Sequence, residues 1–136
     1  MQAAMGIVQM SRLSSFLRKR NELSKLYKEK LKNLPLKFQL VEGNSLCSYH
    51  LFTVKITDKK YERDELFRFL KSHQVASQVH YIPVYHQPFY RSLGFCKNYC
   101  ENVEEYFSSC LSIPLHQKLN EGDIDFVTEK LNNFFS

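Results

Sequence analysis

The spacing of apolar residues in the first quarter of the chain predicts one long helix. Between residues 2 and about 32, apolar side chains recur every three or four positions, which is the period of one buried helix face. They are Ile7, Met10, Leu13, Phe16, Leu17, Leu23, Leu26, Tyr27 and Leu31, with Leu34 just beyond. At 1.5 Å per residue this helix would be about 45 Å long, more than a domain of this size needs to cover one side. We therefore expect the helix to join two bodies, and its small, uncharged first turns (residues 3–6) to pack against one of them.

The remaining pattern predicts three strands alternating with helices. Pro35 ends the first helix, because proline cannot continue one and favours an extended predecessor. Alternation in residues 49–56 predicts a half-buried strand, and residues 61–73 predict a short amphipathic helix. The predicted face of that strand comprises His50, Phe52, Val54 and Ile56. Residues 77–82 predict a second strand, stopped by Pro83.

The last third of the chain predicts two more helices and a strand between them. A short helix near residues 103–107 precedes a third strand at residues 110–113, which Pro114 stops. Asn120 and Asp123 form a loose capping box, the signal of a helix start. The sequence therefore predicts an α+β domain with a three-stranded sheet covered by helices. Residues 1–34 would be the long interdomain helix, and residues 35–136 the small domain.

Composition and charge narrow the class of protein. A hydrophobic content of 43% supports a real core, and no apolar run approaches the roughly 18 residues that span a bilayer. The N-terminus has no basic region before an apolar run, so we expect a cytoplasmic protein with no membrane partner. The net charge is +5, but much of the basic excess lies on the first helix between apolar positions. This favours a solvated helix face over a nucleic-acid interface.

The four cysteines do not have the spacing of a metal site or a disulfide framework. They are Cys47, Cys96, Cys100 and Cys110. Zinc sites need closely spaced pairs joined by a second pair, and only Cys96 and Cys100 are near each other. We expect free thiols and no bound metal.

The densest group of polar rings lies in residues 78–90, QVHYIPVYHQPFY. Two histidines, three tyrosines and two glutamines surround two prolines there. Side chains on a loop fixed by a rigid scaffold can line a cleft, and His and Tyr can both donate and accept hydrogen bonds. The alternative is a strand end whose rings are satisfied by the backbone. No glycine-rich phosphate loop, activated cysteine or pocketed lysine accompanies these rings, so we expect no catalytic residue in this chain.

Five ordered motifs resemble the DegT/DnrJ/EryC1/StrS family of sugar aminotransferases. Residues 1–13 resemble that family's QAALG…QL..L helix, and residues 20–31 its R…Y…L continuation. Residues 48–52 match SYHLF, residues 80–90 match HY.P.H.QP.Y with one additional residue, and residues 111–127 match LSLPL…L…D…V. The amino-sugar 4-aminotransferases of the pseudaminic-acid type resemble it most among the subfamilies.

The resemblance implies a C-terminal domain of a pyridoxal-phosphate (PLP) enzyme of fold type I. Such enzymes are dimers that move an amino group from glutamate to a nucleotide-linked keto-sugar. PLP would bind a lysine of a large N-terminal domain, so this chain alone would hold no PLP and would not be catalytic. On the matching positions, the resemblance implies substrate contacts from the small-domain wall: His80, Tyr81, His86 and Tyr90, with Tyr49 and His50 supporting.

Three interpretations remain open at this point. The chain is a piece of a sugar aminotransferase for surface-polysaccharide or glycan biosynthesis, a stand-alone module that binds a sugar nucleotide or a partner protein, or part of a sugar dehydratase of the same family. The sugar, the nucleotide and the aminated ring position are not encoded in any motif above.

Overall fold

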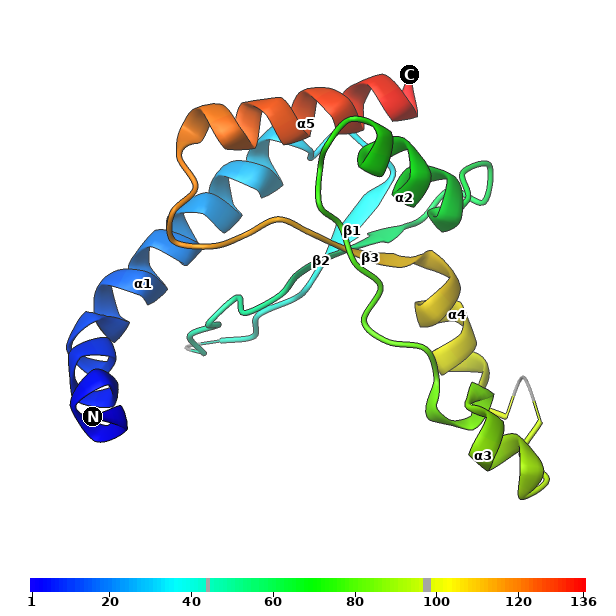
Figure 1. Ribbon diagram of the computed structural model, residues 1–136. Coiled ribbons are helices and arrows are strands. Elements are labelled where there is room, and N and C mark those ends of the chain that lie inside the picture. Colours follow the sequence, from blue (N-terminus) through cyan, green and yellow to red (C-terminus); the bar gives the residue numbers. More distant parts are fainter. Residues whose placement is uncertain (44, 97–98) are drawn as a thin grey trace.

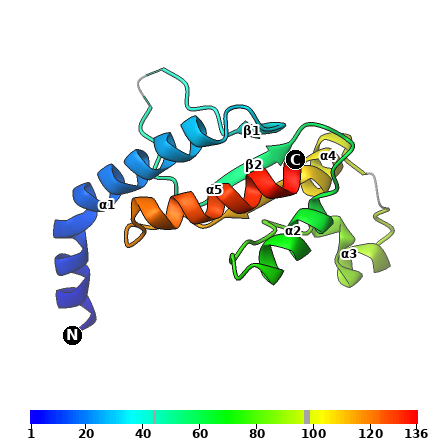
Figure 2. The same cartoon turned by 90° about the horizontal axis from the view of Figure 1, so that it is seen from above.

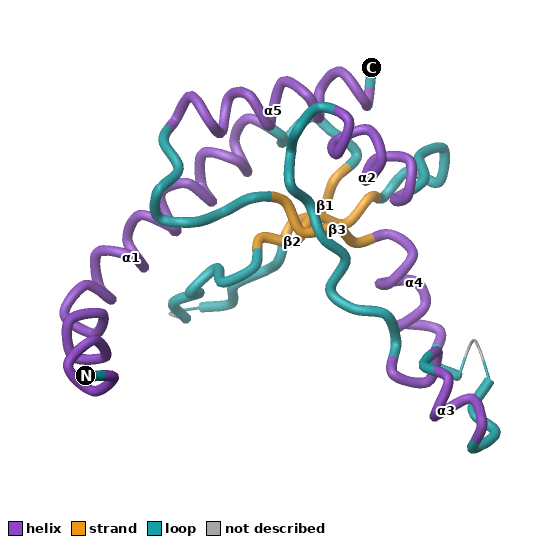
Figure 3. The backbone as a smooth tube through the Cα atoms, in the orientation of Figure 1, coloured by secondary structure: helices purple, strands orange, loops and turns teal. Residues whose placement is uncertain are grey.

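The computed structural model describes residues 1–43, 45–96 and 99–136, and it places one small sheet at the centre of the molecule. Three helices, α1 (Gln2–Lys30), α2 (Arg63–Ser72) and α5 (Glu121–Phe135), lie on one side of the sheet (Figure 1). On the other side, a loop (residues 39–43 and 45–51) and an arm (residues 83–96 and 99–109) extend away from the body (Figure 3). The predicted α+β class, a three-stranded sheet with helices covering it, is confirmed.

The long first helix is confirmed, but only its second half is buried. Leu23 and Tyr27 lie in the core, followed by Leu31 just after the helix, whereas every residue from 1 to 15 is exposed. Figures 1 and 2 show that the dark-blue first part of α1 runs in a different direction from the rest. Ser11 and Ser15 donate hydrogen bonds to carbonyls three residues back, a contact that often bends a helix. The apolar face predicted through the whole helix therefore contacts this domain only in its C-terminal part.

The sheet is antiparallel, with the strand order β1-β2-β3. Its strands are β1 (Leu36–Phe38), β2 (Phe52–Ile56) and β3 (Cys110–Ile113). Phe52, Val54 and Ile56 alternate into the core, as the strand period requires, and Thr53 and Lys55 point to the opposite face. The register pairs Thr53 with Ser112, Lys55 with Cys110 and Lys37 with Lys55. Each of these pairs belongs to the face that the three helices do not cover.

One predicted strand is wrong and one strand was not predicted. Residues 77–82 form only an isolated bridge between Gln78 and Ser112. The chain leaves the sheet after that bridge, since proline at position 83 cannot donate a ladder hydrogen bond. The third strand of the sheet is instead β1, whose three residues are too few to show an alternating pattern. The strand predicted at residues 49–56 begins only at Phe52, because Tyr49 has a φ of 43° and His50 is exposed.

The two shorter covering helices agree with the prediction within two residues. Asn120 accepts a hydrogen bond from the Asp123 backbone, and the Asp123 carboxylate accepts one from the Asn120 backbone, so the capping box is present. Ile124, Val127 and Leu131 of α5 recur at helical spacing and are buried. They pack with α1 and α2 over the sheet to form one core.

The arm carries short helices: the 3-10 turn η1 (Val84–His86), α3 (Pro88–Ser92) and α4 (Glu101–Ser109). In α4 the short helix predicted near residues 103–107 is confirmed. Four rings of the arm form a chain of contacts in the order Tyr85, Tyr99, Phe95 and Tyr90, with neighbouring centroids 5.4–6.2 Å apart. The arm is therefore held together by its own aromatic rings, while α4 connects it to the sheet. Within the described residues, no helix is long and apolar enough to cross a membrane.

Candidate functional site

His80 is held at the end of the sheet by a line of side-chain hydrogen bonds. Its Nδ1 lies 2.9 Å from the Ser112 hydroxyl, and its Nε2 lies 3.1 Å from the Gln78 side-chain oxygen. The Ser112 hydroxyl lies in turn 3.2 Å from the Thr53 hydroxyl on the neighbouring strand. Two strands and the segment that follows the Gln78 bridge thus fix one imidazole ring.

The donors and acceptors in this line define one tautomer of His80. A carboxamide oxygen only accepts, so Nε2 must carry the proton that points to Gln78. Nδ1 of a neutral imidazole is then an acceptor, and the Ser112 hydroxyl donates to it. Ser112 has used its single hydrogen, so it accepts from Thr53. Both ring nitrogens of His80 therefore have a partner, which fixes the orientation of the ring.

Tyr81 extends from this fixed point into solvent. The peptide bond between His80 and Tyr81 is cis, and the two rings meet edge to face with centroids 4.7 Å apart. The Tyr81 side chain is 73% exposed, so its hydroxyl is accessible to a ligand. A cavity of about 170 Å³ lies beside His80, with Gln78, Ser112 and His50 among its lining residues.

Tyr49 and His50 lie next to each other but in different surroundings. Tyr49 is buried and packs its ring against Phe52, with centroids 5.9 Å apart. Its hydroxyl accepts a hydrogen bond from Lys28 at 3.0 Å, and its carbonyl accepts one from Arg20 at 2.7 Å. His50 is exposed and borders both the small cavity and a larger one of about 720 Å³. Tyr49 thus attaches the loop to α1, and His50 is left at the border of the two cavities.

His86 and Tyr90 belong to the arm and do not line either of these cavities. The His86 Nε2 lies 2.7 Å from a Glu104 carboxylate oxygen. Burial and a hydrogen bond with Glu104 raise the pKa of the neighbouring Tyr85 hydroxyl to about 12. Tyr90 packs between other rings of the arm. The structure therefore places His80 and His50 at one cavity, with Tyr81 adjacent to His80, and places His86 in the arm, where it contacts Glu104.

The hydrogen-bonding partners of His80 were not predicted as site residues. Ser112 occupies the middle of a buried strand, and Thr53 alternates with the core residues Phe52 and Val54. The alternation of β2 does predict that the Thr53 hydroxyl lies on the sheet face opposite the core. The contact between Thr53 and Ser112 could not be predicted, because it depends on the strand register that pairs them.

Comparison with known proteins identifies the family. Residues 1–132 match the DegT/DnrJ/EryC1/StrS aminotransferase family. The chain belongs to this family. It is 34% identical over 131 residues to the UDP-4-amino-4,6-dideoxy-N-acetyl-beta-L-altrosamine transaminase of Campylobacter jejuni, covering 94% of this chain and 34% of that protein. It is 28% identical over 138 residues to the spore coat polysaccharide biosynthesis protein SpsC of Bacillus subtilis, covering 98% of this chain and 36% of that protein.

Solved structures of aminotransferases share the fold of this domain. DesV of S. venezuelae, in complex with a ketimine intermediate, superposes with a TM-score of 0.88 at 25% identity, over 99% of this chain and 36% of that one. PseC of Helicobacter pylori gives a TM-score of 0.87 at 23% identity, over 98% of this chain and 36% of that one. The chain spans about a third of the length of the relatives it matches. This share is consistent with the expected C-terminal domain of a fold-type-I PLP enzyme.

The DegT/DnrJ/EryC1/StrS family uses PLP, and neither Lys55 nor Lys28 has the surroundings of a lysine that forms a Schiff base with it. A lysine that forms a Schiff base must be able to lose its proton, which desolvation or a neighbouring cation favours. Lys55, which borders the large cavity, shows the opposite: a hydrogen bond and ion pair with Glu105 raise its pKa. Lys28 donates to the Tyr49 hydroxyl. Among residues 1–43, 45–96 and 99–136, no cluster of histidine, cysteine or acidic side chains could hold a metal ion.

Proposed function

We propose that this chain is the substrate-facing C-terminal domain of an aminotransferase that acts on a nucleotide-linked keto-sugar. The observation that carries the proposal is His80, which Ser112 and Gln78 hold at a cavity in a chain of this family, with the exposed Tyr81 next to it. The parent enzyme would take glutamate as amino donor, act as a cytoplasmic homodimer and serve surface-polysaccharide or glycan biosynthesis. The similarity to the Campylobacter transaminase supports a 4-aminotransferase of an amino-sugar pathway.

Each candidate residue has a role that its surroundings support. The oriented His80 ring and the exposed Tyr81 side chain supply polar contacts for a sugar hydroxyl or a phosphate oxygen. His50 adds a third polar ring at the same cavity, and the buried Tyr49 keeps the His50 loop in place. We assign His86 and Tyr90 to the arm, which would form a second wall of the substrate cleft.

The reaction needs groups that residues 1–136 do not supply. PLP, when bound, withdraws electrons from the substrate carbon, and the protein provides orientation and proton transfer. The lysine that holds PLP would come from a large domain outside these residues. The chain alone would therefore bind no PLP and would not transfer an amino group.

A chimera tests the function directly. Residues 1–136 would replace the segment of the Campylobacter transaminase to which they align, and amino transfer from glutamate would be measured with that enzyme's own substrate. We expect an active chimera. His80→Ala should lower its kcat/KM by about tenfold to a hundredfold, the loss expected for a ligand hydrogen bond of about 1.5–3 kcal/mol. His116→Ala, in an exposed position before α5, is the matched control and should have no effect.

The absorbance of bound PLP separates folding from function in that experiment. A chimera that holds PLP but transfers no amino group would overturn the proposal, as would full activity of the His80→Ala chimera. If the chimera does not hold PLP, the isolated chain is titrated with the same nucleotide sugar and followed by NMR. Shifts centred on His80 and Tyr81 would support the proposal, and shifts elsewhere or none would contradict it.

A dehydratase is the second candidate function, because one such enzyme shares the fold. The E. coli GDP-4-keto-6-deoxy-D-mannose-3-dehydratase superposes on 94% of this chain with a TM-score of 0.77 at 25% identity. The residue at the PLP lysine position of the large domain decides between the two reactions. Reading the coding sequence before residue 1 supplies that residue, and also tests the alternative of a stand-alone binding module.

A further inference from the structure

The loop that carries His50 is hydrogen-bonded to α1 just before that residue. The Arg20 Nη1 donates to the Tyr49 carbonyl at 2.7 Å, and the Asn21 Nδ2 donates to the Cys47 carbonyl at 3.0 Å. A hydrogen bond from a charged donor is about twice as strong as one between neutral groups. The bond from Arg20 is therefore the stronger of the two, and it is the one next to His50.

Tyr49 has a backbone conformation that needs such support. Its φ is 43°, in the left-handed region that few residues other than glycine adopt. Gln74 also has a positive φ, but it follows the end of α2, where this conformation is common. Tyr49 lies instead in a loop before a strand. A strained residue of this kind persists only where its surroundings hold it, and such residues cluster at ligand sites.

The surroundings of Tyr49 do hold it, at both ends of the residue. Its ring is buried against Phe52, and its hydroxyl accepts a hydrogen bond from Lys28 at 3.0 Å. These contacts fix the side chain but leave the following peptide group free to rotate. The bond from Arg20 to the Tyr49 carbonyl fixes that peptide group.

The peptide group in question is the one from which His50 extends. A peptide unit is planar, so the Tyr49 carbonyl oxygen and the His50 Cα belong to one rigid plane. A contact that holds the oxygen therefore also holds the starting point of the His50 side chain. The Arg20 guanidinium thus controls where the imidazole ring begins.

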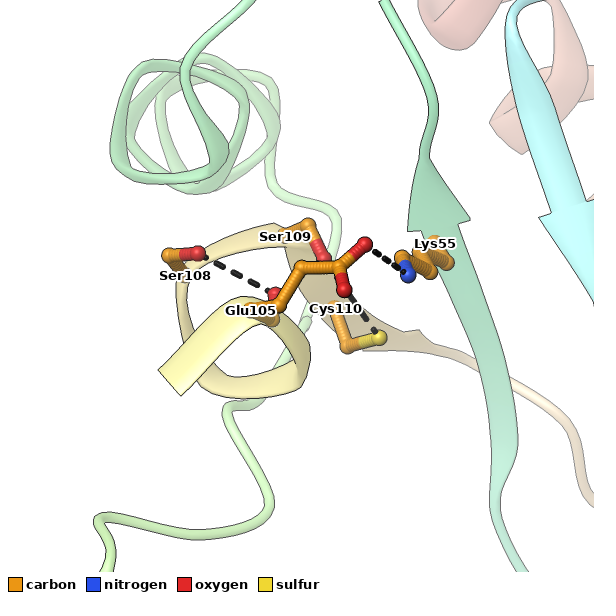
Figure 4. Close-up of polar contacts among 5 residues, drawn as sticks. All are labelled: Lys55, Glu105, Ser108, Ser109 and Cys110. Atoms are coloured by element: carbon orange, nitrogen blue, oxygen red, sulfur yellow. Dashed lines mark hydrogen bonds and ion pairs between the residues drawn. The ribbon is translucent and has the colours of Figure 1, made fainter. Parts of the chain in front are cut away.

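His50 lies where this control affects the cavities. It borders both the cavity of about 720 Å³ and the smaller one of about 170 Å³. Lys55, which lines the larger cavity from the sheet, is held by Glu105 of α4 at 2.6 Å, as Figure 4 shows. The strand part of the wall is thus attached to the arm, and the loop part is attached to α1.

We propose that Arg20 is a positioning residue, which keeps the His50 ring at the substrate cavity by holding the Tyr49 carbonyl. This role rests on the proposed function, because His50 is one of the rings that would contact the nucleotide sugar. Arg20 lines neither of the two cavities and acts only through the loop. Since Arg20 belongs to α1, a displacement of this helix against the sheet would move His50 as well.

NMR relaxation of the 136-residue chain tests whether Arg20 orders His50. In the unsubstituted chain, the His50 amide should have an order parameter of about 0.85, and Arg20→Ala should lower it to about 0.6 or less. Arg20→Lys keeps a charged donor and should restore part of the order. Arg18→Ala is the matched control, because it removes the same charge from an exposed position of the same helix. It should leave the order of His50 unchanged.

Kinetics of the chimera test whether this order matters for the substrate. Arg20→Ala should raise the KM for the nucleotide sugar by about twofold to tenfold, the range of one neutral hydrogen bond, and leave kcat nearly unchanged. A loss of folded protein would do the opposite, since it lowers kcat per total enzyme and leaves KM unchanged. Arg18→Ala should change neither constant.

A double substitution shows whether Arg20 acts through His50. His50→Ala should raise KM by a similar factor, and adding Arg20→Ala to it should raise KM no further, because the ring that Arg20 positions is gone. Equal effects of Arg20→Ala with and without the His50 ring would overturn the proposal. Equal order of His50 in the Arg20→Ala and Arg18→Ala chains would overturn it as well.

The two measurements separate this role from the proposed function. If Arg20→Ala releases His50 but the chimera holds PLP and transfers no amino group, the transaminase is rejected and the ordering of the loop by Arg20 is retained. If the chimera is active and sensitive to His80→Ala, but its KM ignores both Arg20→Ala and His50→Ala, the positioning role alone is rejected.

Discussion

Removing the Ser112 hydroxyl tests the orientation of His80. Ser112→Ala deletes the hydroxyl that forms hydrogen bonds with the His80 Nδ1 and with the Thr53 hydroxyl. The side chain is only 6% exposed, so water cannot easily replace the hydroxyl at that position. The substitution adds no bulk and breaks no backbone bond, and its effects should therefore come from the two lost hydrogen bonds.

The size of the effect follows from these contacts. Each hydrogen bond contributes about 0.5–1.5 kcal/mol net, so the pair contributes about 1–3 kcal/mol. His80 and Thr53 are partly exposed and can turn to solvent, which favours the lower half of that range, about 1–2 kcal/mol. For 136 residues the entropy of unfolding is about 0.29 kcal/mol/K, so Tm should fall by about 3–7 °C. Ser108→Ala, at an exposed position of α4, should change stability by less than about 0.5 kcal/mol.

Calorimetry and nitrogen NMR of the histidine rings measure the two parts of this prediction. In the unsubstituted protein, Nε2 of His80 should carry the proton and Nδ1 should show a hydrogen-bonded resonance. Ser112→Ala should move the Nδ1 resonance toward that of a free ring nitrogen and leave the proton on Nε2. A proton found on Nδ1 in the unsubstituted protein, or equal melting temperatures for the Ser112 and Ser108 variants, would refute the reasoning.

Three further substitutions test the packing, the helix cap and the ion pair. Tyr27 is fully buried, and its hydroxyl donates to the Pro114 carbonyl at 3.0 Å. Tyr27→Phe should therefore lower the free energy of unfolding by about 1–3 kcal/mol in a denaturant titration. The same change at the partly exposed Tyr61, whose hydroxyl also donates to a carbonyl, should lower it by less. Asn120→Ala should lower stability by about 0.5–2 kcal/mol through loss of the α5 cap, and a loss below the low end would show that Asp123 caps the helix alone. Because Lys55 lowers the pKa of Glu105, the pair stabilises the protein above the ordinary glutamate pKa and loses that effect as pH falls through the lowered value. The Tm difference between the unsubstituted protein and Glu105→Gln should therefore vanish in acid, and a difference that persists there would point to packing.

The elements predicted from the sequence were those whose signals are local. The capping box of Asn120 and the period of Ile124, Val127 and Leu131 lie within one helix, so both could be read directly. β1 could not, because a three-residue strand after Pro35 has no period of its own and exists only by pairing with β2. The strand predicted at residues 77–82 had suitable residues, but only Gln78 finds a partner.

The site shows the same division between local and long-range information. His80 and Tyr81 stood out as polar rings beside a proline, and the structure places His80 at a cavity. The side chains that support His80 come from positions 53 and 112, whose proximity depends on the register of strands far apart in the chain. The opposition of Lys37 and Lys55 also depends on register, so no sequence window contains it.

Because only the C-terminal half of α1 is buried, the backbone hydrogen bonds of its two halves should differ in how easily they open. Residues 1–11 have no charged side chain and are exposed, whereas Leu23 and Tyr27 are buried in the core. Amide hydrogens of the first turns should exchange with solvent at rates near those of a fraying peptide, and those around Tyr27 should exchange only on global unfolding. Trypsin should accordingly cleave first after Arg12, at the exposed part of the helix, and leave the remaining body folded. A partner that covers the first turns would slow both processes, so exchange and proteolysis at this end report its docking.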